Sequence, residues 1–153
     1  MTNRAFIFLA IALVRVTVCS CSNGQYDIDS CKERLEGRYG TVDRRTVIEG
    51  PERGDGVFCG SMVLEVLGDG IALMSGSFNA TGRVVDSNLK MDVMIVDAED
   101  GTSLRYEFGI VESSRTLYRL DWSYTVQGTV VNDFGEEVEY RAKGKVEARR
   151  LSK

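Results

Sequence analysis

The chain has 153 residues, of which 43% are hydrophobic and 27% are charged, so it is long enough for one folded domain and its composition argues against disorder. The formal net charge of −4 does not favour a nucleic acid as a partner. Histidine is absent, which removes the commonest general base and the commonest metal ligand. We therefore expect no enzymatic activity, no cofactor and no metal.

The N-terminus has the pattern of an export signal. The apolar run from Ala5 to Val14 is too short to span a membrane. Residues 18–21 (Val-Cys-Ser-Cys) resemble the lipobox of bacterial lipoproteins, which implies that Cys21 carries acyl chains and anchors the protein to a membrane. We expect export to the bacterial cell envelope as a periplasm-facing lipoprotein. The alternative is an ordinary secretory cleavage near Ser20 or Ser22, with the protein secreted.

Two cysteines remain in the folded domain beyond the signal region. In an oxidising compartment, Cys31 and Cys59 predict one disulfide, which would close a loop of roughly thirty residues and stabilise the fold by about 3 kcal/mol. The alternative is a pair of free, buried thiols.

The folded part is expected to begin with one short helix. Ser30 and Glu33 fit a capping box, so one or two helical turns are predicted over Cys31–Glu36, ending at Gly37. The remaining segments predict strands separated by turn residues. The expected strands cover residues 38–48, 57–67, 71–78, 83–85, 89–95, 104–110, 118–126 and 138–148.

Three runs between Thr102 and Ala148 place apolar residues at every second position, which is typical of half-buried antiparallel strands. The fold class is therefore all-β: one up-and-down meander of about eight strands, closed as a barrel because closure removes the exposed edges. A sandwich is the alternative if residues 128–131 cross between two sheets. We expect a signal peptide at 1–20, a tether and short helix at 21–34 and a β-barrel domain at 35–153.

Three residues and the order of the elements carry a resemblance to the lipocalins, which are calycins. Gly37-Arg38-Tyr39 opens the first strand after a short helix, and the basic pair Arg149-Arg150 follows the last strand. In that family Gly-x-Trp opens the first strand and a late arginine packs over the tryptophan. Here Tyr39 stands at the tryptophan position, and either Arg149 or Arg150 is its partner. The resemblance implies a lipocalin-like barrel whose interior holds an apolar small molecule.

The inward face is rich in aromatic residues, and the hydroxyls of its tyrosines need partners or water. We expect these side chains to line a site for an apolar or amphipathic small molecule; the alternative is a filled core without a ligand. The predicted lining residues are Phe58, Met62, Tyr106, Phe108, Tyr118, Trp122, Tyr124 and Tyr140.

A second function fits the same fold. With a filled core, the protein would be an envelope interaction module, either an inhibitor or an assembly-associated lipoprotein, and Glu49–Gly56 and Asn132–Glu136 would carry the contact. The sequence does not name the protein partner. The basic residues between Arg141 and Lys153 are expected to be the solvated face of the last strand.

Overall fold

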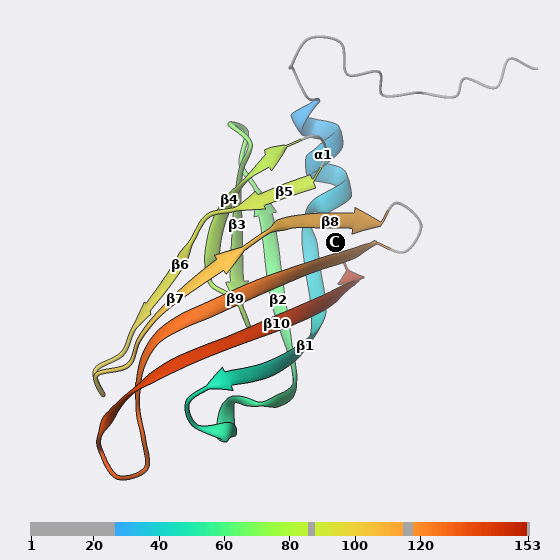
Figure 1. Ribbon diagram of the computed structural model, residues 1–153. Coiled ribbons are helices and arrows are strands. Elements are labelled where there is room, and N and C mark those ends of the chain that lie inside the picture. The colour runs from blue at the N-terminus through green and yellow to red at the C-terminus, as the bar shows by residue number, and fades with distance from the viewer. Residues whose placement is uncertain (1–26, 86–87, 115–117, 153) are drawn as a thin grey trace, which may run out of the picture.

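The computed structural model describes residues 27–85, 88–114 and 118–152 as one antiparallel sheet closed into a barrel, with a short helix at one end (Figure 1). The signal peptide expected at 1–20 and the lipidation site at Cys21 lie outside these residues. The helix α1 covers Ile28–Leu35, and a 3-10 turn, η1, covers Glu52–Gly54. The strands are β1 Gly37–Glu49, β2 Gly56–Val66, β3 Ile71–Gly76, β4 Ala80–Val85, β5 Asn88–Met91, β6 Met94–Asp97, β7 Ser103–Phe108, β8 Ile110–Ser114, β9 Arg119–Val131 and β10 Glu137–Ser152.

Eight strands form the closed ring. They follow the order β1-β2-β3-β4-β5-β8-β9-β10, and β10 pairs back with β1. At the end of the barrel away from α1, β7 pairs with β9 and β6 pairs with β7. There β7 takes the position in the sheet that β8 has nearer α1, and β6 takes the position of β5. The prediction of an all-β antiparallel barrel with a short N-terminal helix is confirmed. The sandwich alternative is wrong, because residues 128–131 continue β9 and pair with β10.

The helix starts earlier than its predicted capping box. Asp27 is the N-cap, and its side chain accepts a hydrogen bond from the Ser30 backbone N–H at 3.4 Å. The helix packs Leu35 into the barrel, and the Tyr39 hydroxyl donates to the Leu35 carbonyl at 2.6 Å. The helix therefore closes this end of the barrel, which we call the closed end. None of the helical segments in the described ranges has the length and apolarity that crossing a membrane requires.

Of the two C-terminal arginines, Arg150 is the one that lies opposite Tyr39 in the sheet. The two residues are paired across β1 and β10, and the Arg150 guanidinium donates to the carbonyls of Arg34 at 3.3 Å, of Glu33 at 3.1 Å and of Glu36. These carbonyls lie in the last turn of α1 and at its C-cap, so the arginine fastens the end of α1 to the sheet. Arg149 instead pairs with Glu147 on the outside. This closed end is compatible with a calycin-like barrel.

The half of the barrel next to α1 is filled with side chains. Phe78, from the β3–β4 turn, inserts into the interior, with its ring centroid 5.5 Å from that of Trp122 and 6.2 Å from that of Tyr124. This half therefore fits the filled-core alternative. Its buried side chains are Met62, Leu64, Val66, Ala72, Met74, Val84, Leu89, Met91, Val111, Leu120, Trp122, Val146 and Ala148.

The predicted disulfide is wrong, because Cys31 and Cys59 are both free. Cys31 is buried under the closed end, whereas Cys59 is exposed on β2. Gly37, at the closed end, pairs with Leu64, and Val42 pairs with Cys59. Cys59 therefore lies about 17 Å farther from the closed end along β2 than Leu64 does. Bonded cysteines hold their Cβ atoms about 4 Å apart, which this separation excludes.

Candidate functional site

The opposite end of the barrel is hollow, and we call it the open end. The β3–β4 turn stops short of it, whereas β1, β2, β9 and β10 run on. A cavity of about 320 Å³ lies there. Its lining is mostly apolar, with one guanidinium and one phenol: Arg45, Pro51, Gly54, Phe58, Leu104, Val130 and Tyr140.

Beside this cavity, a charged cluster stands inside the barrel. Asp43 and Arg45 both face inward from β1, and the Arg45 Nη2 lies 3.1 Å from the Asp43 Oδ2. Tyr124 completes the cluster, because its hydroxyl donates to the Asp43 Oδ2 at 2.7 Å and accepts from the Arg45 Nε at 2.8 Å. The guanidinium also lies 5.3 Å from the centre of the Phe58 ring. Each charge is therefore met by an opposite charge and a hydroxyl, as burial requires.

A glycine makes the cluster possible. Gly144 lies on β10 between Arg45 on β1 and Tyr124 on β9, and it is the direct cross-strand partner of both. A Cβ at Gly144 would overlap the Tyr124 ring and hydroxyl. The missing side chain lets the ring lie flat across β10, so that its hydroxyl reaches Asp43.

The electrostatics fix the charge states of this cluster. Burial and the hydrogen bond to Asp43 raise the pKa of Tyr124 well above its ordinary value. Burial also raises the pKa of Tyr106, although Arg45 opposes the shift. For Arg45, burial alone would lower the pKa, but the interactions with Tyr124, Tyr106 and Asp43 outweigh it and the net pKa is raised. Near neutral pH the two tyrosines are therefore neutral and Arg45 is charged.

At this end of the barrel, two buried side-chain polar atoms lack hydrogen-bond partners within the described part of the chain. They are the Asp43 Oδ1 and the Tyr140 hydroxyl, in residues that are 3% and 5% exposed as a whole. Gly54 of η1 lies directly on the Tyr140 hydroxyl, where a Cβ would overlap it. An unpaired buried polar group costs about 1–3 kcal/mol, so a ligand that supplies the missing hydrogen bonds gains affinity.

The structure divides seven of the eight predicted lining residues into three groups. Phe58 and Tyr140 line the cavity. Behind them Tyr106 and Phe108 stack on one another with ring centroids 6.3 Å apart, while the other three predicted residues on this face, Met62, Trp122 and Tyr124, are buried in the barrel interior.

The Tyr118 prediction is wrong. This residue is 54% exposed and has a φ of 45°, so it lies in the turn before β9 and not on the inward face. Its ring contacts Arg150, whose guanidinium carbon lies 5.1 Å from the ring centre.

Sequence reasoning missed Asp43 and Arg45. The signal that would have found them is the alternation of Thr41, Asp43, Arg45 and Val47 along β1, which places two charges on the inward face.

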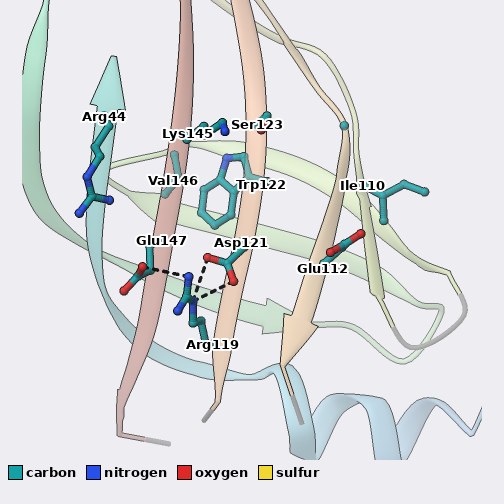
Figure 2. A pocket seen from close by; sticks show the side chains of 11 residues that line it. Arg44, Ile110, Glu112, Arg119, Asp121, Trp122, Ser123, Lys145, Val146 and Glu147 are labelled. Carbon is teal, nitrogen blue, oxygen red and sulfur yellow. Dashed lines mark hydrogen bonds and ion pairs between the residues drawn. The ribbon is translucent and has the colours of Figure 1, made fainter. Parts of the chain in front are cut away.

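A second hollow, of about 470 Å³, lies on the outer wall (Figure 2). Its charges balance, with three cationic and three anionic side chains: Arg44, Arg119 and Lys145 against Glu112, Asp121 and Glu147. Figure 2 shows Arg119 between two carboxylates, 2.8 Å from Asp121 and 3.0 Å from Glu147. These charges sum to zero, and the lining is more polar than that of the open-end cavity, which is therefore the better candidate for an apolar ligand.

Together, the fold and the cavity define a small β-barrel with one plugged end and one hollow end. Within the described residues, no three His, Cys, Asp or Glu side chains come together in a way that could hold a metal ion. No protein-family model matches this sequence, and no curated protein matches it either.

Proposed function

We propose that this protein is an exported, lipid-anchored envelope protein that binds an amphipathic small molecule in the open end of its barrel. The observation that carries the proposal is the Tyr140 hydroxyl, which is buried at a mostly apolar cavity and lacks a partner in the described residues. An apolar ligand body would cover Phe58, Leu104 and Val130, and a polar group of the ligand would pair with the hydroxyl.

The cavity also limits the class of ligand. A volume of about 320 Å³ lies at the small end of ligand pockets, which favours a small ring system or a short acyl chain. The Arg45 charge is already matched by Asp43 and Tyr124, so an anionic head group would have to displace an internal carboxylate. A neutral polar group is therefore the better fit.

The proposed anchor is consistent with access to this cavity. Cys21 precedes α1 by a few residues, and α1 covers the closed end. Acyl chains on Cys21 would hold the closed end near the membrane and leave the open end facing away from it. The intact mass of the mature chain tests the lipidation, because acylation adds the mass of the acyl chains to that of the polypeptide.

The binding proposal is tested with N-phenyl-1-naphthylamine, an apolar fluorophore that carries one N–H donor. We expect its fluorescence to rise with the native protein, because the dye leaves water for the cavity. Leu104→Trp should abolish the rise by filling the cavity, and Tyr140→Phe should weaken binding about threefold to tenfold through one lost hydrogen bond. Ile110→Trp, on the exposed outer face, is the matched control. Equal fluorescence with Leu104→Trp and Ile110→Trp would refute the site.

Native mass spectrometry of protein purified from the cell envelope provides a second test of the same proposal. It should detect a bound molecule in the unmodified protein and lose it in Leu104→Trp.

A further inference from the structure

The barrel wall has a gap on one side of the open end. β3 and β4 have six residues each, whereas β1 and β9 have 13 each. Below the β3–β4 turn, Gly56–Gly60 of β2 therefore pairs only with β1. In the part of the chain that the structure describes, β6 pairs only with β7. We call this break in strand pairing between β2 and β6 the lateral gap, and the unpaired side of β6 the β6 edge; Figure 1 shows where the two strands lie.

The β6 edge offers unpaired backbone groups. The Ala98 N–H donates to the Thr102 carbonyl at 2.8 Å. This bond shows which residues of β6 direct their backbone groups toward β7 and which direct them away from it. In an antiparallel pair, every second residue directs both its N–H and its C=O away from the partner strand. Ile95 and Asp97 are these residues, so their backbone groups face the lateral gap.

Apolar side chains on both sides of the gap remain exposed. Ile95 is 61% exposed on the outer face of β6. Phe58 and Val96 face the barrel interior, yet they are 43% and 38% exposed because no strand covers them. An added strand would bury this surface, and each β-branched or aromatic cross-strand contact would stabilise the pairing.

The charges around the gap specify the partner. Asp92, Asp97 and Glu99 flank β6, and Glu52 and Asp55 lie in the loop that leads into β2. None of the ion pairs found in the described ranges involves these five residues. By sequence, the three loops of this end together with the strand ends that adjoin them, residues 49–56, 97–102 and 132–139, hold ten acidic residues and one basic residue.

We propose that the β6 edge binds an extended segment of a basic polypeptide as an additional strand of the sheet. Backbone hydrogen bonds to Ile95 and Asp97 would give the affinity, alternate apolar side chains would enter the lateral gap, and lysines or arginines at the ends of the segment would meet the acidic residues. A second copy of this chain is a poorer occupant, because it would bring the same carboxylates to the same edge. The interaction does not depend on a ligand in the cavity.

The test uses a fluorescein-labelled peptide, Lys-Val-Thr-Val-Thr-Val-Lys, and the full chain, with binding followed by fluorescence anisotropy. We expect saturable binding that weakens as salt is added, because the charges involved are exposed. Ile95→Pro removes the free N–H while leaving the β6–β7 bonds in place, and it should weaken binding about tenfold or more. Ile95→Thr keeps that N–H and is the matched control. Circular dichroism checks that both variants fold.

The charge contribution is tested separately. The double variant Asp97→Asn, Glu99→Gln should weaken peptide binding about threefold to tenfold, and a peptide with glutamate in place of both lysines should not bind. No binding of the lysine peptide, unchanged binding by Ile95→Pro, or equal binding of the glutamate peptide would each overturn the proposal. So would a dimer in sedimentation velocity that Ile95→Pro dissolves, because the edge would then belong to a second copy.

Discussion

Replacing Gly144 with alanine tests whether the buried cluster of Asp43, Arg45 and Tyr124 holds the middle of the barrel together. In an ordinary strand this change would stabilise the fold by about 0.5–1 kcal/mol, because glycine loses more backbone freedom on folding. Here the new Cβ would overlap the Tyr124 ring. We therefore expect the opposite sign.

The expected magnitude follows from what the ring would lose. A displaced Tyr124 gives up two hydrogen bonds to charged groups, at 2.7 Å to Asp43 and 2.8 Å to Arg45. Each such bond contributes about 1.5–3 kcal/mol, and repacking an overfilled core adds about 1–3 kcal/mol. After the backbone gain is subtracted, Gly144→Ala should lower the free energy of unfolding by about 3–8 kcal/mol.

Urea unfolding followed by the fluorescence of Trp122, the single tryptophan, measures this change. Gly109→Ala is the matched control, because a Cβ at Gly109 approaches nothing closer than the Ser123 carbonyl oxygen at 3.9 Å. In a Tyr124→Leu background, Gly144→Ala should cost less than about 1 kcal/mol, since the ring is gone. A cost below about 1 kcal/mol in the native background, or the same cost in both backgrounds, would refute the account.

Three further predictions concern other parts of the barrel. Burial raises the pKa of Tyr39, Tyr106 and Tyr124, so their contribution to the free energy of unfolding should be constant up to about pH 10 and decrease above it, because tyrosines ionise first in the unfolded chain; urea unfolding with tyrosinate absorbance measures this. Iodoacetamide should label Cys59 in the native protein and Cys31 only after unfolding, as read by peptide mapping; two unreactive cysteines would contradict the free thiols. Arg150→Ala should speed hydrogen exchange in α1 more than in β9, whereas equal acceleration would mean a global effect.

Period-two patterning predicted the interior side chains well where strands run without interruption. Tyr106, Trp122 and Tyr140 all face inward and are buried, as their alternation with charged residues indicated. The pattern carries this information because successive side chains of a strand point to opposite faces, so one register fixes the whole strand.

The same pattern failed where strands break. Phe108 of β7 pairs with Tyr124 of β9, and Glu112 of β8 pairs with Asp121 of β9. Four residue steps from β7 to β8 therefore lie opposite three steps along β9, and the extra residue forms a bulge. Beyond the bulge the inward face changes, and Ile110 points outward although it continues the apolar alternation. A bulge is set by pairing with a neighbouring strand, which local periodicity does not record.

The buried cluster was missed for a related reason. A charge on an inward position is tolerable only when a partner is present, and the partner of Asp43 and Arg45 is Tyr124, about eighty residues later in the chain. The predicted disulfide failed for the same reason, because an even number of cysteines in an oxidising compartment does not show how far apart Cys31 and Cys59 lie in the fold. The cavity and the lateral gap also depend on strand pairing, which the sequence alone did not reveal.

The shortness of β3 and β4 accounts for the positions of both the open-end cavity and the lateral gap. Where all eight strands overlap, the barrel is closed and its apolar interior is filled. At the level where β3 turns into β4, Phe78 and Tyr124 form the last enclosed layer, and Asp43 and Arg45 lie beside it. The Asp43 side chain is 5% exposed, whereas the Arg45 side chain, one step toward the open end, is already 20% exposed. The ion pair thus spans the boundary between core and opening, where a buried charge is least costly and a ligand can still reach it.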